Sequence, residues 1–195
     1  MPIYGEDSYE NCLIELFSDV LGYSHVYGPN VERDLHSPLY NSVLEESICR
    51  INQRASSQGI SEALQKLRNF ENADLVKKNA LFMDYLQNGI EVSFSQNGQI
   101  ESEIIHIVDF QNINNNSFIV ANQWTFIENS NKRPDILIFL NGIPICLFEL
   151  KSPSREQTDA SEAYTQIRNY MQEIPSMFIY NCICVMSDQL TSKAG

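Results

Sequence analysis

The chain is poor in positive charge. Its 195 residues include 13 lysines and arginines against 25 aspartates and glutamates, for a net charge of −12. A protein that holds a polyphosphate by itself normally presents excess positive charge, so any affinity for nucleic acid must be local or come from a partner. Some basic residues do cluster in the sequence, either as a small phosphate-facing patch or as ordinary solvated charges: Lys132, Arg133, Lys151, Arg155 and Arg168.

Long apolar runs and paired cysteine motifs are also missing. No segment approaches the ~18 apolar residues that cross a bilayer, and no signal-peptide pattern opens the chain. The five cysteines are an odd number without a C-x-x-C pair, which favours buried free thiols in a reducing compartment over disulfides or a metal site. We therefore expect a soluble, cytoplasmic protein that does not contact a membrane.

The hydrophobic content of 43% is enough for one good core, so we expect a single domain over residues 1–195. Apolar residues at helical spacing predict a first helix that ends at Gly22 and three helices between Ser42 and Gln87. A capping box at Ser42 opens these three helices, and Gly89 ends them. Residues 23–40 show little periodicity and are predicted to form a surface loop.

From Ile90 onward the hydrophobic period changes to two, which is typical of strands. The predicted elements are strands over 90–95 and 100–108 joined by a turn at Asn97-Gly98, a strand over 118–127 and a strand pair within 133–151. A helix of about twenty residues that Pro175 stops and a buried strand over 177–186 follow. The chain stops soon after this last strand, which suggests a piece of a longer protein.

Residues 133–151 read RPDILIFLNGIPICLFELK, two apolar strands around the strong turn signal Asn141-Gly142. Asp135 opens the first strand, and Glu149 and Lys151 close the second. Two carboxylates that converge at the end of a sheet suit Mg²⁺, and a lysine beside them can orient or deprotonate a water and stabilise charge on a phosphate. The same charges could equally form a solvated strand end without catalysis.

The register of this hairpin decides whether the two carboxylates meet. In a regular two-residue hairpin Asp135 would face Phe148, and Asp135 and Glu149 would lie on opposite faces. A shared metal site requires one extra residue, either in a three-residue loop with a glycine bulge or in a bulge at Pro144, which has no amide hydrogen. We predict such a bulge.

Gln166 and Tyr170 are four residues apart and therefore neighbours on one face of the helix that follows Lys151. In isolation, the tyrosine would be a core residue and the glutamine a solvated one. Because the helix begins just after Lys151, it could return both side chains to the charged end of the strand pair.

The ordered set Pro134-Asp135, Glu149-Leu150-Lys151 and Gln166-Ile167-Arg168-Asn169-Tyr170 resembles the PD-(D/E)xK nuclease core with its QxxxY helix. More narrowly, the chain resembles the N-terminal nuclease domain of the type I restriction endonuclease R (motor) subunit, HsdR. This likeness extends to Glu10, Leu21-Gly22-Tyr23, Val108-Asp109-Phe110, Asn116-Ser117-Phe118, Asn122-Gln123 and Val185-Met186-Ser187-Asp188. The resemblance implies an α/β fold with a restriction-endonuclease-like core, a mixed central β-sheet flanked by helices.

The resemblance also implies roles for individual residues. Asp135 and Glu149 would bind Mg²⁺, for which Mn²⁺ would substitute, helped by the Leu150 carbonyl. Lys151 would be the third catalytic residue and assist the attacking water. Supporting or DNA-contacting roles would fall to three further residues: Gln166, Tyr170 and Glu10.

In such subunits ATP-driven translocase domains follow the nuclease domain, which would make this chain an N-terminal fragment. No GxxxxGK[ST] loop occurs here, so ATP would bind only to the full-length subunit. The implied function is that of a type I site-specific deoxyribonuclease, an Mg²⁺-dependent endonuclease that cuts duplex DNA non-specifically after translocation. The full-length subunit would act in a complex with methylation (M) and specificity (S) subunits. The fragment alone is expected to be inactive.

Two alternatives stay open. The first is a non-catalytic docking or coupling module on the same fold, which the acidic balance favours. The second is a stand-alone nuclease or junction resolvase. The helices between Ser42 and Gln87 have no assigned role and would either contact the motor or simply complete the core.

Overall fold

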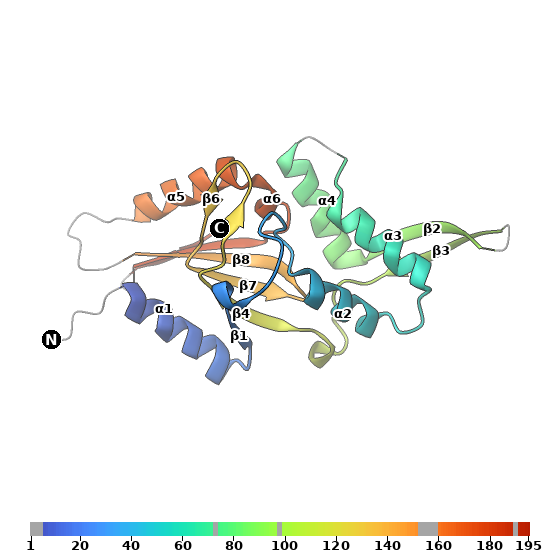
Figure 1. Cartoon of the computed structure of the whole chain (residues 1–195), viewed down its shortest axis with the longest axis horizontal. Helices are drawn as coiled ribbons and strands as arrows, with labels where there is room; N and C mark the ends of the chain where they lie inside the picture. Colours follow the sequence, from blue (N-terminus) through green and yellow to red (C-terminus); the bar gives the residue numbers. More distant parts are fainter. Residues whose placement is uncertain (1–5, 72–73, 97–98, 152–159, 189–190) are drawn as a thin grey trace.

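A six-stranded mixed sheet forms the centre of the computed structural model, which describes residues 6–71, 74–96, 99–151, 160–188 and 191–195 (Figure 1). The strands in spatial order are β1 Ser24–Tyr27, β4 Phe118–Asn122, β7 Ile136–Leu140, β8 Ile143–Leu150, β9 Ile183–Ser187 and β10 Ser192–Ala194. β1 with β4 and β8 with β9 are parallel pairs, and the other neighbours are antiparallel. The predicted α/β fold, with a mixed sheet flanked by helices, is confirmed.

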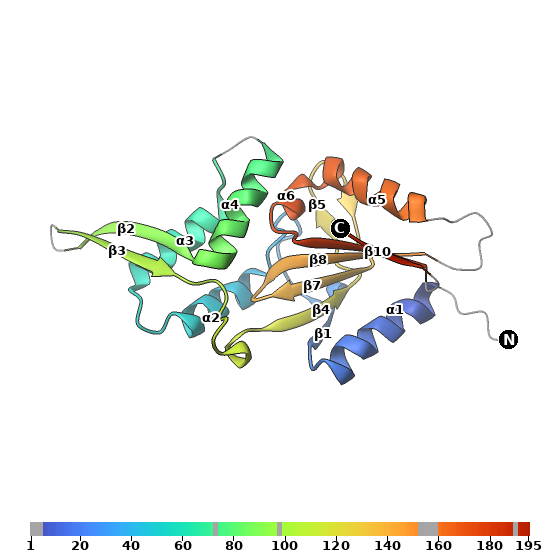
Figure 2. The same ribbon diagram turned by 180° about the vertical axis from the view of Figure 1, so that it is seen from behind.

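Helices cover both faces of this sheet (Figures 1 and 2). α1 Glu6–Glu15, continued by the π-helical turn η1 Leu16–Val20, packs on one face, and α5 Ala160–Glu173 with α6 Pro175–Phe178 packs on the other. Strand alternation decides which side chains meet which helix. On β7, Ile136 and Ile138 point to the α1 face, whereas Leu137 points to the α5 face.

A helical lobe lies beside one end of the sheet (Figures 1 and 2). It consists of α2 Asn41–Ile51, α3 Ser57–Arg68, α4 Leu75–Asn88 and the hairpin of β2 Ile90–Gln96 and β3 Gln99–Ile105. Its core includes the fully buried Leu44, Phe82 and Ile105 and continues into Ile143 and Tyr180 of the sheet region. The three helices predicted without a role therefore form a core shared with the sheet.

The connections contain short elements that the sequence did not indicate. They are the 3-10 turns η2 Gly28–Asn30 and η3 Ile113–Asn115 and the small hairpin of β5 Phe126–Ile127 and β6 Asn131–Lys132. The single strand predicted over residues 118–127 is split into β4 and β5, because Gln123 between them has a left-handed backbone with φ 53°.

Three further local predictions are wrong. Residues 23–40 contain β1, a strand of only four residues that exists because it pairs in parallel with β4. Ser42 lies inside α2, whose N-cap is Tyr40 and lacks a side-chain cap. Residues 177–186 do not form one strand, because Pro175 opens α6 as its first residue and β9 begins only at Ile183.

All five cysteines are free, as predicted, but only Cys146 and Cys184 are buried, whereas Cys12, Cys49 and Cys182 are exposed. Burial raises the pKa of the Cys146 thiol to about 12. No helix in the described part of the chain is both long enough and apolar enough to span a membrane. The predicted turn at Asn97-Gly98 lies outside the described residues.

Candidate active site

The β7–β8 hairpin begins as a regular two-residue hairpin. Asn141 and Gly142 both have left-handed backbones, with φ 51° and 79°, and Leu140 pairs directly with Ile143 across the turn. Such a pair of positive φ values matches the right-handed twist of the flanking strands, and asparagine followed by glycine adopts it at low cost. The turn signal read from the sequence is confirmed.

The register then shifts by one residue within the hairpin. Phe139 pairs with Pro144, but Ile138 pairs with Cys146, so Ile145 is the extra residue of a β-bulge. Proline next to the bulge is consistent with its missing amide hydrogen, which cannot contribute to the ladder. The prediction of a bulge is confirmed, but the extra residue is Ile145 and not Pro144, and the turn itself needs no third residue.

This shift places Asp135 and Glu149 side by side. Ile136 pairs with Phe148 on the α1 face, so the next position on each strand, Asp135 and Glu149, points to the α5 face. The carboxylate of Asp135 accepts a hydrogen bond from the backbone amide of Leu150, with 2.7 Å between Oδ2 and N. The bulge therefore converts a register that separates the two carboxylates into one that joins them.

Lys151 completes this charged end of the hairpin, which we call the acidic rim. Its Nζ donates to Oε1 of Glu149 at 2.6 Å, and its backbone amide donates to the carbonyl of Ser187 at 2.9 Å. Glu149 is 1% exposed, so the ion pair lies in a largely dehydrated position where Coulomb attraction is strong. The sequence correctly placed Glu149 and Lys151 on one face.

Helix α5 adds a polar pair to the acidic rim. Gln166 Nε2 donates to the hydroxyl of Tyr170 at 2.8 Å, and that hydroxyl is hydrogen-bonded to Glu149. Burial, together with the carboxylates of Glu149 and Asp135, raises the pKa of Tyr170 well above its usual value, so its phenol stays protonated at neutral pH. The helix returns this pair to the charged end of the strands, as predicted.

Glu10 occupies a neighbouring but separate position. It is buried, and its Oε1 accepts a hydrogen bond at 2.7 Å from Nδ2 of Asn122, a residue that strand alternation places on the α1 face. Within the described residues, no group of three or more acidic, histidine or cysteine side chains has metal-binding spacing. The structure thus brings Asp135 and Glu149 together and does not add Glu10 to them as a third carboxylate.

The donor chemistry of the acidic rim fits Mg²⁺. This ion takes hard oxygen ligands, commonly one or two carboxylates, and leaves its other positions to water and substrate phosphate. Asp135 and Glu149 supply two carboxylates on one face, and Leu150 lies between Glu149 and Lys151 on the same strand. Of the basic residues named from the sequence, Lys132 pairs with Glu173 at 2.6 Å, and Arg155 lies outside the described residues.

The opposite end of the hairpin is held by a polar network that the sequence did not reveal. Asn141 is fully buried, and its side chain accepts a hydrogen bond from the Ser117 amide at 2.7 Å and donates to the Ile107 carbonyl at 2.9 Å and to Asn116 Oδ1 at 2.8 Å. This asparagine was identified only as a turn former. Its three partners come from a loop about 25 to 35 residues away in sequence, which periodicity cannot detect.

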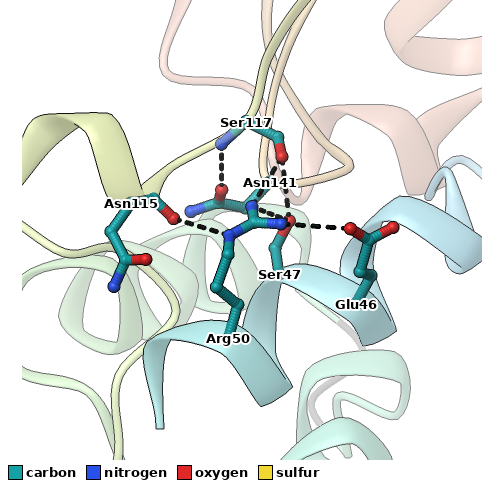
Figure 3. Close-up of polar contacts among 6 residues, drawn as sticks. All are labelled: Glu46, Ser47, Arg50, Asn115, Ser117 and Asn141. Carbon is teal, nitrogen blue, oxygen red and sulfur yellow. Dashed lines mark hydrogen bonds and ion pairs between the residues drawn. The ribbon is translucent and has the colours of Figure 1, made fainter. Parts of the chain in front are cut away.

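Arg50 of α2 ties the helical lobe to this network (Figure 3). Its Nε donates to the Asn115 carbonyl at 3.1 Å, and its Nη2 donates to the hydroxyls of Ser117 at 2.7 Å and Ser47 at 3.1 Å. A side chain on Gly142 would also collide with α2, because a Cβ there would lie 2.6 Å from the Leu44 amide nitrogen. The turn of the strand pair is thus fixed by the helical lobe.

Comparison with known proteins gives a consistent result. A family model described as "Type I restriction enzyme R protein N terminus" matches residues 3–195. The chain is 31% identical over 185 residues to the type I restriction enzyme HindI endonuclease subunit of Haemophilus influenzae, covering 90% of this chain and 18% of that protein. It is 33% identical over 196 residues to a protein of Methanocaldococcus jannaschii named as a candidate type I restriction enzyme endonuclease subunit, MjaIXP, covering 95% of this chain and 19% of that protein.

A second M. jannaschii protein, named as a candidate MjaVIIIP endonuclease subunit, is 30% identical over 185 residues, covering 92% of this chain and 17% of that protein. The chain therefore spans less than a fifth of the length of the curated relatives it matches. The likeness concerns one region of these larger proteins.

Proposed function

Because the chain belongs to the family of type I restriction enzyme R protein N termini, we propose that it is the nuclease domain of a type I restriction-modification enzyme and hydrolyses phosphodiester bonds of duplex DNA with Mg²⁺. One observation carries the proposal. The bulge at Ile145 aligns Asp135 with Glu149 on one face, next to Lys151. A hairpin that served only to fill a core would not need two carboxylates in adjacent positions.

In this proposal Asp135 and Glu149 hold the metal ion, with the Leu150 carbonyl as a further ligand. When bound, Mg²⁺ would polarise the phosphate and lower the pKa of a water, and Mn²⁺ would substitute for it. The ammonium of Lys151, whose Nζ lies 2.6 Å from Oε1 of Glu149, would stabilise negative charge on the phosphate and orient the attacking water. Deprotonation of that water would require the neutral amine form of Lys151.

Gln166 and Tyr170 support this arrangement from α5. The Tyr170 hydroxyl accepts a hydrogen bond from Gln166 and therefore directs its own proton toward Glu149. Because the phenol stays protonated, it fixes the carboxylate without adding a charge. In the same proposal, Gln166 or Tyr170 also contacts DNA once the duplex is bound.

DNA is delivered by other parts of the enzyme in this proposal. The net charge of −12 disfavours independent binding of a duplex, and the matched relatives are more than five times as long as the matched region. We propose that ATP-driven translocase domains of the full-length subunit supply DNA, and that methylation and specificity subunits select where the complex assembles. The isolated chain should then cut DNA poorly or not at all.

Cleavage by the complete complex tests the role of Lys151. We expect Lys151→Ala to reduce double-strand cleavage by about 10³-fold or more, with ATP hydrolysis and translocation preserved, because it removes charge stabilisation at the reacting phosphate. Lys66→Ala is the matched control, since Lys66 also makes one close contact, 2.8 Å to the Glu91 carbonyl, but lies in the helical lobe. Normal cutting by Lys151→Ala would show that its assigned role is wrong.

Metal titration separates a nuclease from a docking or coupling module. A nuclease domain should bind Mn²⁺ in a calorimetric titration of the 195-residue chain, and Asp135→Ala should weaken this binding about tenfold or more because it removes one of two carboxylate ligands. A module without catalytic function would show no binding that depends on Asp135. This measurement needs neither DNA nor the remainder of the complex.

A further inference from the structure

A second polar network lies on the α1 face, one strand away from Asp135. Besides its bond from Asn122, the Glu10 carboxylate accepts from Nε2 of Gln123, at 3.3 Å to Oε2. His25 on β1 extends the network, with 3.0 Å between its Nε2 and Oδ1 of Asn122. None of the four ion pairs among the described residues includes Glu10, so neutral amides hold this buried carboxylate.

The chemistry of these groups fixes the direction of each hydrogen bond. Nδ2 of Asn122 donates to Oε1 of Glu10, so the NH₂ group of this amide faces the carboxylate. The carbonyl oxygen of the same amide then faces His25, whose Nε2 must carry a hydrogen and donate it. Asn122 therefore bridges the two side chains: it donates to Glu10 and accepts from His25.

The network ends at the chain segment beside Asp135. β4 ends at Asn122, which pairs with Ile136, the first residue of the antiparallel strand β7. Gln123 directly follows β4 and Asp135 directly precedes β7, so the two residues lie at the same end of this strand pair. Gln123 has φ 53°, a left-handed conformation that costs about 1 kcal/mol for a residue other than glycine and persists only where neighbours hold it. Glu10 holds the side chain of Gln123. The backbone carbonyl of Gln123 packs against Gly28, where an added Cβ would lie 2.5 Å from the carbonyl oxygen.

We propose that His25 is a positioning residue of the nuclease site, an inference that rests on the proposed function. As a hydrogen-bond donor, His25 keeps the Asn122 amide aligned with Glu10, and Glu10 keeps Gln123 in its left-handed turn next to Asp135. Without that donor the Asn122 carbonyl loses its partner in the network, and only Glu10 then holds the amide. His25 acts through Asn122 and does not itself contact DNA or metal.

Cleavage kinetics of the complete complex at saturating Mn²⁺ test this role. Loss of one hydrogen bond in a positioning network predicts cleavage about 2- to 10-fold slower for His25→Ala. His25→Gln keeps an N–H donor and should restore most of the rate. His36→Ala, which changes another exposed histidine, is the control and should cut at the wild-type rate.

A readout independent of activity follows the side-chain NH₂ protons of Asn122 by NMR in the 195-residue chain. In wild type and in His25→Gln, the chemical shifts of these protons should be displaced by their hydrogen bond to Glu10, and the protons should exchange slowly with water. In His25→Ala the displacement of the chemical shifts should disappear. A loss of general stability alone would not move this signal in the folded population. It would instead lower the unfolding midpoint.

The outcomes distinguish this inference from the proposed function. If His25→Ala cuts at the wild-type rate with unchanged Asn122 protons, while Asp135→Ala abolishes cleavage, the inference is overturned and the nuclease assignment stands. If His25→Gln is as slow as His25→Ala, hydrogen-bond donation is not the cause and the inference is overturned as well. If Asp135→Ala leaves cleavage intact, the proposed function is overturned, and the positioning role that rests on it is overturned with it.

Discussion

The two ends of the β7–β8 hairpin are both polar, yet they are built in opposite ways. At the turn, Asn141 is fully buried and makes three side-chain hydrogen bonds to neutral partners. At the acidic rim, Asp135, Glu149 and Lys151 gather ionised groups in a small volume, with Glu149 1% exposed. The same pair of strands thus carries a neutral, satisfied network at one end and concentrated charge at the other.

This difference indicates which end serves the fold and which serves the chemistry. Neutral amides in reciprocal hydrogen bonds stabilise a unique conformation, because each lost partner leaves a buried group unsatisfied. Adjacent carboxylates repel each other and are costly to bury, so placing them side by side needs another reason, such as a cation. Substitutions at the turn should therefore lower stability, and substitutions at the acidic rim should mainly lower activity.

The largest stability loss is expected for Asn141→Ala. It removes two buried hydrogen bonds and one partly buried one, and it places at φ 51° an alanine that no side-chain hydrogen bond holds. Together these losses predict a decrease of about 3 to 5 kcal/mol in the free energy of unfolding. Glycine adopts the left-handed conformation readily, so the free energy of unfolding of Asn141→Gly should decrease by about 1 kcal/mol less than that of Asn141→Ala. Urea denaturation measures both, and a loss under 1 kcal/mol for Asn141→Ala would contradict the role given to the turn network.

A smaller loss is expected for Arg50→Ala, about 1 to 2 kcal/mol, because it removes the bonds from α2 to the Asn115 carbonyl and the Ser117 hydroxyl. Arg54→Ala changes an exposed arginine a few residues further along and should stay within about 0.5 kcal/mol. Equal effects of the two substitutions in thermal unfolding would mean that Arg50 does not fasten the turn to the helical lobe.

Alkaline stability tests the acidic rim without DNA. Because the folded-state pKa of Tyr170 lies above its unfolded value of 10.0, its contribution is fully present below pH 10 and is lost as the pH rises further. Phenylalanine cannot ionise, so the free energy of unfolding of Tyr170→Phe should fall less steeply between pH 10 and 11 than that of the wild type. Tyr164→Phe, an exposed tyrosine on the same helix, should leave the slope unchanged.

Thiol chemistry probes the part of the hairpin between its two ends. Cys146 pairs with Ile138 just past the bulge and is 9% exposed, and burial raises its thiol pKa from 9.0 to about 12. Its reaction with a disulfide reagent at pH 8 should be at least about 10²-fold slower than that of the exposed Cys12, because both the thiolate fraction and access are low. Mass spectrometry of labelled peptides measures both rates, and similar rates would show that the hairpin opens readily.

The sequence predicted the long helices and the strong hairpins well. Gly89 ends α4, with φ 83°, and the Asn141-Gly142 turn forms where expected, because these signals depend on the local backbone preferences of a few neighbouring residues. It missed β1 and β10, which are strands of four and three residues that form only by pairing with β4 and β9. Propensity over so few residues carries little information against tertiary context.

The candidate site shows the same division. By itself, the sequence determined that Asp135 and Glu149 could share a face only if one extra residue interrupted the hairpin, since side chains alternate with a period of two. Only the tertiary structure decided where that residue lies, at Ile145, whose carbonyl accepts the amide of Cys182 near the neighbouring β9. It also decided that Glu10 pairs with Asn122 on the opposite face, because contacts between distant segments depend on packing that local sequence patterns do not encode.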